Sequence, residues 1–163
     1  MELMDEITAR AVMRCLEIDV DFYRDLYVFL LKKHSKIIAD DLDWLTDSLN
    51  DEQAFLMKSK SLEDKRLELF RGLGIEDKRL SELAEMSPEE YRAKIKMLSG
   101  QLTELVENIT NLNAETTEMV KRKLDNQKEL VARAGIIDKP ETYNKNASKV
   151  AGGQSAAKAF KHI

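Results

Sequence analysis

The chain of 163 residues has few of the residue types that build disulfides, tight turns and β-sheets. It has one cysteine, Cys15, which excludes an intrachain disulfide and a metal site built on a cysteine pair. Six glycines and two prolines leave little material for turns, and aromatic residues make up only 6% of the chain. Charged residues reach 34%, and this balance favours long helices over a sheet.

Long apolar runs are also missing, since no stretch approaches the roughly 20 residues that a membrane-spanning helix needs. The first residues, MELMDEIT, lack the positive charge with which a secretory signal begins. These absences predict a cytoplasmic protein that does not insert into a membrane. The net charge of −4 and the lack of a basic stripe along any predicted helix also argue against nucleic-acid binding.

Catalytic and metal-binding patterns are missing as well. The two histidines stand far apart in the sequence, and no glycine-rich loop follows a predicted strand. His34 is expected on the surface near a helix end, and Cys15 is expected as a small buried apolar residue. The sequence therefore predicts no enzyme, no cofactor and no small-molecule substrate, and protein surfaces remain as the place to look for function.

The strongest positive signal is a heptad seam between Ser87 and Gly135. Its apolar positions alternate steps of four and three, as in a coiled coil: Tyr91, Ile95, Leu98, Leu102, Leu105, Ile109 and Leu112. A weaker stripe continues through Thr116, Val120, Leu124, Gln127, Val131 and Ala134. Ser87 predicts an N-cap, Glu90 closes a capping box, and Gly135 predicts the end of a helix over about 88–134.

Two further long helices are predicted over about 5–39 and 42–71. The apolar stripe of the first is expected at Ile7, Ala11, Cys15, Ile18, Phe22, Leu26 and Phe29. The stripe of the second is expected at Leu42, Leu45, Leu49, Phe55, Leu62 and Leu69. The fold prediction is an all-α, elongated, antiparallel bundle of three long coiled-coil helices within residues 1–135. Residues 136–163 are expected to form a flexible tail that is disordered or ordered by a partner.

The predicted third helix is longer than the other two, so its C-terminal end should project past them with its seam uncovered. Its candidate protein-binding residues are Met119, Val120, Leu124, Val131 and Ala134. The tail ends in a small helical stripe, in which Phe160 and Ile163 are the large members. This stripe can remain solvated, fold onto a partner, or fold onto the uncovered seam.

The sequence resembles the FlgN family of flagellar export chaperones over about residues 22–163. Matching positions in the second predicted helix and its exit are Phe55-Leu56, Leu62-Glu63, Arg66, Leu69 and Leu73-Gly74. Later positions that are similar to the family are Leu112-Asn113, the segment from Glu141 to Asn144, and the final isoleucine. The chain departs from the family's pattern at Glu52, Ser59 and Thr116, where lysine, leucine and asparagine are usual. The first 20 residues are expected to lie outside the family's usual extent.

The resemblance implies a cytoplasmic chaperone that is not an enzyme. Its partners would be the C-terminal regions of the hook-associated proteins FlgK and FlgL, together with the flagellar type III export apparatus. The resemblance also implies that the region after the third helix contributes to binding, and that Tyr143 docks at the export gate. The alternatives that remain are a helical adaptor of another assembly and a structural coiled-coil dimer.

Overall fold

The computed structural model describes residues 3–135, and within that range all regular structure is helical. The helices are α1 (Glu6–Ile38), α2 (Leu42–Asp47), α3 (Leu49–Gly72), α4 (Leu80–Met86) and α5 (Glu89–Arg133). The prediction of an all-α fold is confirmed. The predicted tail lies outside the described residues.

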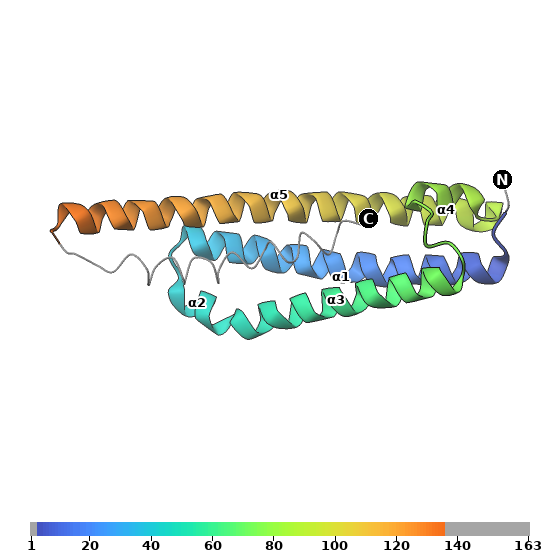
Figure 1. The fold of residues 1–163 in the computed structure, drawn as a ribbon, viewed down its shortest axis with the longest axis horizontal. Coiled ribbons are helices and arrows are strands. Elements are labelled where there is room, and N and C mark those ends of the chain that lie inside the picture. Colours follow the sequence, from blue (N-terminus) through green and yellow to red (C-terminus); the bar gives the residue numbers. More distant parts are fainter. Residues whose placement is uncertain (1–2, 136–163) are drawn as a thin grey trace.

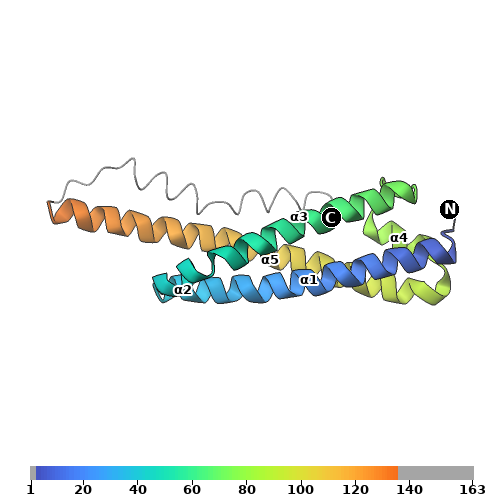
Figure 2. The same cartoon turned by 90° about the horizontal axis from the view of Figure 1, so that it is seen from below.

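Helices α1 and α5 run side by side in the same direction, and α3 runs the opposite way along α1 (Figures 1 and 2). Contacts between α1 and α5 extend along both helices. Near their starts, the Tyr91 hydroxyl donates to Glu6 Oε1 over 3.0 Å. Near the end of α1, Lys123 Nζ lies 2.6 Å from Asp40 Oδ1. Because α3 packs mainly on α1 and makes few close backbone contacts with α5, the three long helices form an open arrangement.

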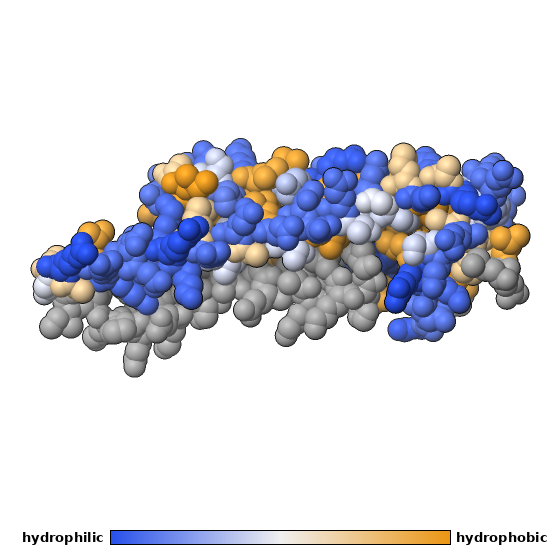
Figure 3. Space-filling view, turned by 90° about the horizontal axis from the view of Figure 1, so that it is seen from above, coloured by the Kyte–Doolittle hydropathy of each residue, from blue (hydrophilic) through white to orange (hydrophobic). Residues whose placement is uncertain are grey.

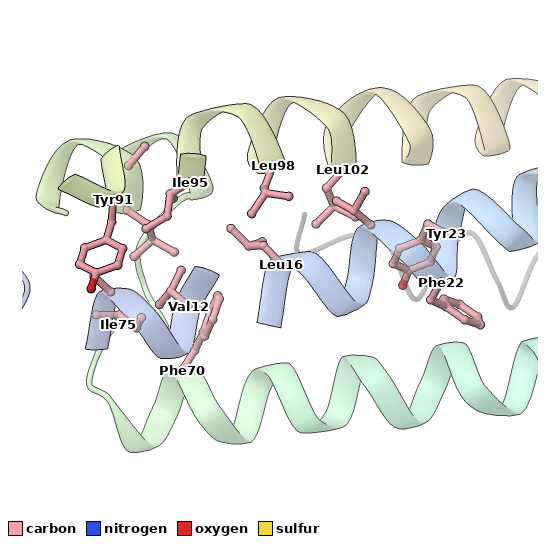
Figure 4. Packing of buried hydrophobic residues seen from close by; sticks show 14 of the residues in the cluster. Val12, Leu16, Phe22, Tyr23, Phe70, Ile75, Tyr91, Ile95, Leu98 and Leu102 are labelled. Atoms are coloured by element: carbon pink, nitrogen blue, oxygen red, sulfur yellow. The ribbon is translucent and has the colours of Figure 1, made fainter. Parts of the chain in front are cut away.

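The predicted seam of α5 forms the spine of the core. Six of its seven members are buried and Leu105 is half-buried, packed against the core. Figure 4 shows Ile95, Leu98 and Leu102 pointing from α5 toward α1, where Leu16 faces them. The alternating steps of four and three keep these side chains on one side of a helix about 67 Å long at 1.5 Å per residue.

The predicted apolar stripe of α1 was partly wrong. Phe22 and Leu26 are buried as expected, but Ile7 and Ile18 are exposed, with 79% and 49% of their surfaces accessible. The buried face instead follows a heptad seam with steps of three and four: Ala9, Val12, Leu16, Asp19, Tyr23, Leu26 and Leu30. The polar Asp19 occupies a central seam position, which is why a search for apolar side chains alone selected the neighbouring face.

Local signals mark several of the helix boundaries. The carboxylate of Asp5 accepts a hydrogen bond from the Thr8 backbone N–H over 2.7 Å and caps α1, which lowers the Asp5 pKa. Helix α3 ends in a Schellman motif, with Gly74 at φ +71° and the Ile75 N–H donating to the Phe70 carbonyl over 2.9 Å. Gly135, at φ +72°, follows α5 as predicted.

The predicted capping box at the start of the longest helix was wrong. Ser87 is fully buried, and its hydroxyl donates to the Leu83 carbonyl over 2.6 Å instead of capping α5. Helix α5 begins at Glu89 after Pro88, without a side-chain cap. The short helix α4, which precedes this turn, packs on α5. Its last turn therefore uses the hydroxyl that the sequence pattern assigned to the next helix.

The second predicted helix is broken at Ser48, which separates α2 from α3. The Ser48 hydroxyl donates to the Leu45 carbonyl over 3.1 Å and so competes with the helical ladder at this turn. Leu42 and Leu49, expected in the core, are exposed, whereas Leu45 is half-buried. The later positions of the predicted stripe, Phe55, Leu62 and Leu69, do pack against the core.

Candidate protein-binding surface

The C-terminal end of α5 projects beyond the rest of the helices. Figures 1 and 2 both show it extending past the end of α1 and past α2. The ion pair between Lys123 and Asp40 marks the level at which α1 ends. The residues from Leu124 to Arg133 then continue for about 15 Å at 1.5 Å per residue. No α5 residue after Leu112 is buried, so the expected uncovered end is present.

The predicted binding residues on α5 form the apolar side of this end. Met119, Val120, Leu124 and Val131 are half-buried, and Ala134 is exposed at the C-cap. The sequence analysis missed Leu130, whose side chain is 64% exposed. Leu130 follows Met119 by eleven residues, which is about three helical turns, so the two residues lie on the same side of α5. This spacing could have identified Leu130 from the sequence.

A second group of exposed apolar side chains lies next to the projecting end, at the turn between α1 and α2. Ile38 and Leu42 are 57% and 72% exposed. Lys123 on α5 reaches this turn, because its Nζ also lies 3.4 Å from the Ile38 carbonyl oxygen. We define the α5 end surface as the apolar residues of these two neighbouring elements: Met119, Val120, Leu124, Leu130, Val131, Ile38 and Leu42.

Two cross-helix contacts fix the root of the projecting end against α1. His34 was expected on the surface, but it is half-buried and its Nδ1 lies 2.8 Å from the Thr116 hydroxyl. Thr116 thus continues the seam with a polar contact at the position where the family usually has asparagine. The pair between Lys123 and Asp40 follows two turns later. These contacts hold α5 in register where its seam leaves the core.

The charge of the C-terminal part of α5 differs from that of the whole chain. Between residues 121 and 133, five basic side chains stand against Asp125 and Glu129, although the chain has a net charge of −4. Figure 3 shows the outward face of α5 as largely hydrophilic. The basic excess lies at residues 121–123, whereas the projecting part from Leu124 to Arg133 carries two basic and two acidic side chains. The projecting end is therefore an amphipathic helix with a mixed polar side, which suits an apolar partner segment.

The interface between α1 and α3 contains a buried ion pair. Arg66 Nη1 on α3 lies 2.9 Å from Asp19 Oδ2 on α1, and both side chains are almost fully inaccessible. Burial raises the pKa of the Asp19 carboxyl, and the positive charge of Arg66 opposes that rise. Burial likewise raises the pKa of Tyr23, beside which lies the Ser59 hydroxyl of α3.

The single cysteine behaves as expected for a structural residue. Cys15 is half-buried and packs against the core one turn before Asp19. Burial and the negative charge of Asp19 raise the pKa of the Cys15 thiol to about 11, so little reactive thiolate forms at neutral pH. Within residues 3–135, no group of His, Cys, Asp and Glu is arranged to hold a metal ion. No described helix is both long and apolar enough to cross a bilayer.

Three predicted site residues lie outside the described part of the chain. They are Tyr143, the predicted contact to the export gate, and Phe160 and Ile163, the predicted partner-binding residues of the tail. Their roles stay predictions. The structure brings together only the members of the site that lie on α5, and it adds Leu130, Ile38 and Leu42 to them.

The fold and this surface define an elongated helical protein with an uncovered apolar end, an arrangement suited to binding other proteins. A family model described as "FlgN protein" matches residues 1–151. The chain therefore belongs to the FlgN family, a family of flagellar export chaperones. Searches of curated proteins and of solved structures gave no match.

The extent of the family match corrects one expectation. Because the match begins at residue 1, the first 20 residues belong to the family's extent, contrary to the sequence analysis. Most of α1, including Asp19, therefore lies in a segment that the family shares. The match ends at residue 151, before the tail residues Phe160 and Ile163.

Proposed function

We propose that this protein is a cytoplasmic export chaperone for the hook-associated proteins FlgK and FlgL. It binds their C-terminal regions, prevents their premature polymerisation and delivers them to the flagellar type III export apparatus. Membership of the FlgN family supports the chaperone role. The observation that carries the proposal is the α5 end surface, which leaves apolar helical positions uncovered at the end of the protein.

The chemistry of this surface fits a helical client segment. Val120, Leu124 and Val131 lie on one side of α5 at steps of four and seven, the spacing that receives the apolar stripe of a second helix. A client whose terminal region forms a helix only on assembly would expose such a stripe while unassembled. Covering that stripe blocks the contact that the client makes with its own copies. The chaperone needs no cofactor or bond-making chemistry for this task.

The tail has two parts in this proposal. Phe160 and Ile163 add apolar contacts to the bound client, and Tyr143 serves the later contact with the export gate. Five lysines against two acidic residues after Gly135 make this segment basic. Its charge would favour an acidic client segment.

Titration calorimetry with the C-terminal regions of FlgK and FlgL tests the proposal. We expect micromolar or tighter binding by the full chain, and weaker binding by a chain cut after Ile137. Equal binding by both chains would restrict the client site to the α5 end surface and remove Phe160 and Ile163 from it. If the full chain bound neither region, the assignment of FlgK and FlgL as clients would be wrong.

A further inference from the structure

Helix α3 is a poor cover for the face of α1 on which it lies. Only three of its 24 residues are buried, namely Ser59, Arg66 and Phe70, and two of these are polar. By contrast, ten residues of α1 are buried, including Phe22 and Leu26. Helix association in water depends mainly on the apolar area that is buried. The attachment of α3 is therefore weak for its length.

The shape of the interface agrees with its composition. Figures 1 and 2 show α3 inclined to α1, so the two helices do not run parallel along their lengths. At the C-terminal end of α3, Phe70 lies against the core near Val12 (Figure 4). Toward the other end, the Phe55 ring centroid lies 5.0 Å from that of Phe29 and 6.1 Å from that of Phe22. Between these two aromatic contacts lie the polar Ser59 and Arg66, together with the half-buried Leu62 and Leu69.

The ion pair between Asp19 and Arg66 adds little strength to the interface. Its main effect is to select a helix that carries a cation at this position. Both Asp19 and Arg66 lose almost all their contact with water, and the cost of removing them from water offsets much of their attraction. Arg66 Nη2 has no hydrogen-bond partner among residues 3–135, so the pair is only partly satisfied. An apolar helix without a cation would leave Asp19 buried and unpaired, which excludes it.

We propose that α3 is a displaceable cover, and that an amphipathic helix of the exported client takes its place on α1. The client helix must carry an arginine or lysine opposite Asp19. It must also carry a large apolar side chain one turn after that cation, as Phe70 follows Arg66, and another about three turns before it, where Phe55 now lies. The identity of the client rests on the proposed function, but the opening of α3 is a property of this chain alone.

The two surfaces can act in sequence. A client first held by the α5 end surface competes with α3 as a tethered ligand, at a high effective concentration. Helix α3 remains attached through α2 and through the segment between Gly74 and Leu80, so its release is reversible. Elements that open for binding are expected among the least stable parts of a fold, and the composition of α3 places it there.

Hydrogen exchange measured on the full chain tests the cover directly. In the free protein, we expect the amides of α3 to exchange as one group, at least about tenfold faster than those at the buried positions of α1 and α5. Adding the C-terminal region of FlgK or FlgL should increase exchange in α3 while it protects α1. Equal exchange of α3, α1 and α5 in the free chain would contradict the proposal.

The bound state separates this inference from the proposed function. If the client binds and α3 stays as protected as before, the proposed function holds and the displacement of α3 is wrong. If the client does not bind, the proposed function is wrong, and the client helix cannot be the segment that replaces α3 on α1. A client region whose basic residues are changed to glutamine should bind at least about tenfold more weakly, and unchanged binding would contradict the role of Asp19.

Replacing both residues of the ion pair with apolar residues should hold α3 more firmly on α1. In Asp19→Leu/Arg66→Met, apolar side chains replace the buried charges, so α3 should exchange about tenfold more slowly and the client should bind about tenfold more weakly. The matched control is Glu17→Leu/Lys94→Met, which removes an exposed pair of 3.0 Å between α1 and α5 and should change neither property. Tighter client binding by the first variant would contradict the proposal.

If the double variant Asp19→Leu/Arg66→Met fails to fold, the isosteric variant Asp19→Asn tests the same proposal. It removes the charge that holds Arg66, so exchange in α3 should rise while α1 and α5 keep their protection. A parallel rise in all three helices would mean that the pair stabilises the whole fold, and the idea of a separate cover would be wrong.

Discussion

At the scale of single residues, the most consequential position in the described structure is Asp19. It occupies a central seam position of α1 and is almost fully buried, with Arg66 as its ionic partner on α3. Two departures from the family's pattern lie in the same interface. Glu52 forms a half-buried ion pair with Lys33, and Ser59 lies beside the Tyr23 hydroxyl. This chain therefore has polar contacts between α1 and α3 at both positions, one of which usually carries leucine in the family.

Removing one partner of the buried pair should be costly. Arg66→Met leaves the Asp19 carboxylate without a counter-charge inside the protein, and we expect it to lower the free energy of unfolding by about 3 kcal/mol at neutral pH. Urea denaturation followed by circular dichroism measures this loss. The control Lys94→Met breaks an exposed pair with Glu17 and should cost less than about 1 kcal/mol. Equal losses for the two variants would show that burial of the pair is unimportant.

The same variant should depend on pH with a definite sign. Burial raises the pKa of Asp19 and Arg66 opposes the rise, so without Arg66 the folded-state pKa lies higher still. A group with a raised folded-state pKa favours folding when protonated. The stability deficit of Arg66→Met should therefore shrink as the pH falls from neutral toward 3.8, the ordinary Asp value. Asp19→Asn/Arg66→Met should lack this trend, and a deficit that grew with acidity would contradict the assignment.

At the scale of helices, the end of α3 shows how the conformation of one residue fixes where an element stops. Gly74 adopts a left-handed conformation at φ +71°, which lets the Ile75 N–H and the Gly74 N–H satisfy the last carbonyl groups of α3. Gly72 lies inside the last turn of the same helix, with no positive φ and nothing within 4 Å of an added Cβ. Gly74 therefore needs the conformational freedom of glycine, whereas Gly72 does not.

Alanine substitutions at these glycines should change stability in opposite directions. Gly74→Ala forces a side chain into the left-handed region and should destabilise the protein by about 1–2 kcal/mol. Gly72→Ala adds a helix-favouring residue in open space and should stabilise it by about 0.5–1 kcal/mol. Thermal denaturation of the two variants measures both effects. A loss of stability at Gly72 equal to that at Gly74 would rule out the conformational explanation.

The sequence predicted the helices better than it predicted their faces. The approximate bounds of α1 and the seam of α5 could be found because regular apolar steps are local signals. The buried face of α1 could not, because the charged Asp19 stands on it and its partner Arg66 is 47 residues away. The break at Ser48 depends on one hydroxyl that donates to the turn before it. Such choices are made by tertiary packing, which a single sequence does not display.

In the candidate site too, local features could be predicted from the sequence, whereas contacts between distant elements could not. Helix lengths alone predicted that α5 would project and expose Val120, Leu124 and Val131. The contribution of Ile38 and Leu42 could not be predicted, because it depends on Lys123 joining α5 to the turn after α1. Leucines such as Leu42 look like core residues in a sequence, and only the arrangement of the helices shows that no helix between residues 3 and 135 buries Leu42.

At the scale of the whole molecule, the main feature is the unequal length of two parallel helices. Helix α5 has 45 residues and α1 has 33, and their starts are aligned by the contacts of Tyr91 with Glu6. The difference must therefore appear at the other end, where α5 leaves the core. This arrangement leaves an amphipathic helical end outside the core, and the proposed binding of a client depends on that end.

The most direct test is calorimetric titration of the C-terminal regions of FlgK and FlgL into Leu124→Asp/Val131→Asp. The account predicts binding about a hundredfold weaker than for the unchanged chain, because two charges would enter an apolar contact. The control Ile18→Asp alters an apolar residue on α1 that is 49% exposed and lies outside the α5 end surface, and it should change affinity by less than about threefold. Unchanged binding by the α5 variant, with its helices intact by circular dichroism, would contradict the central claim that clients bind the projecting end of α5.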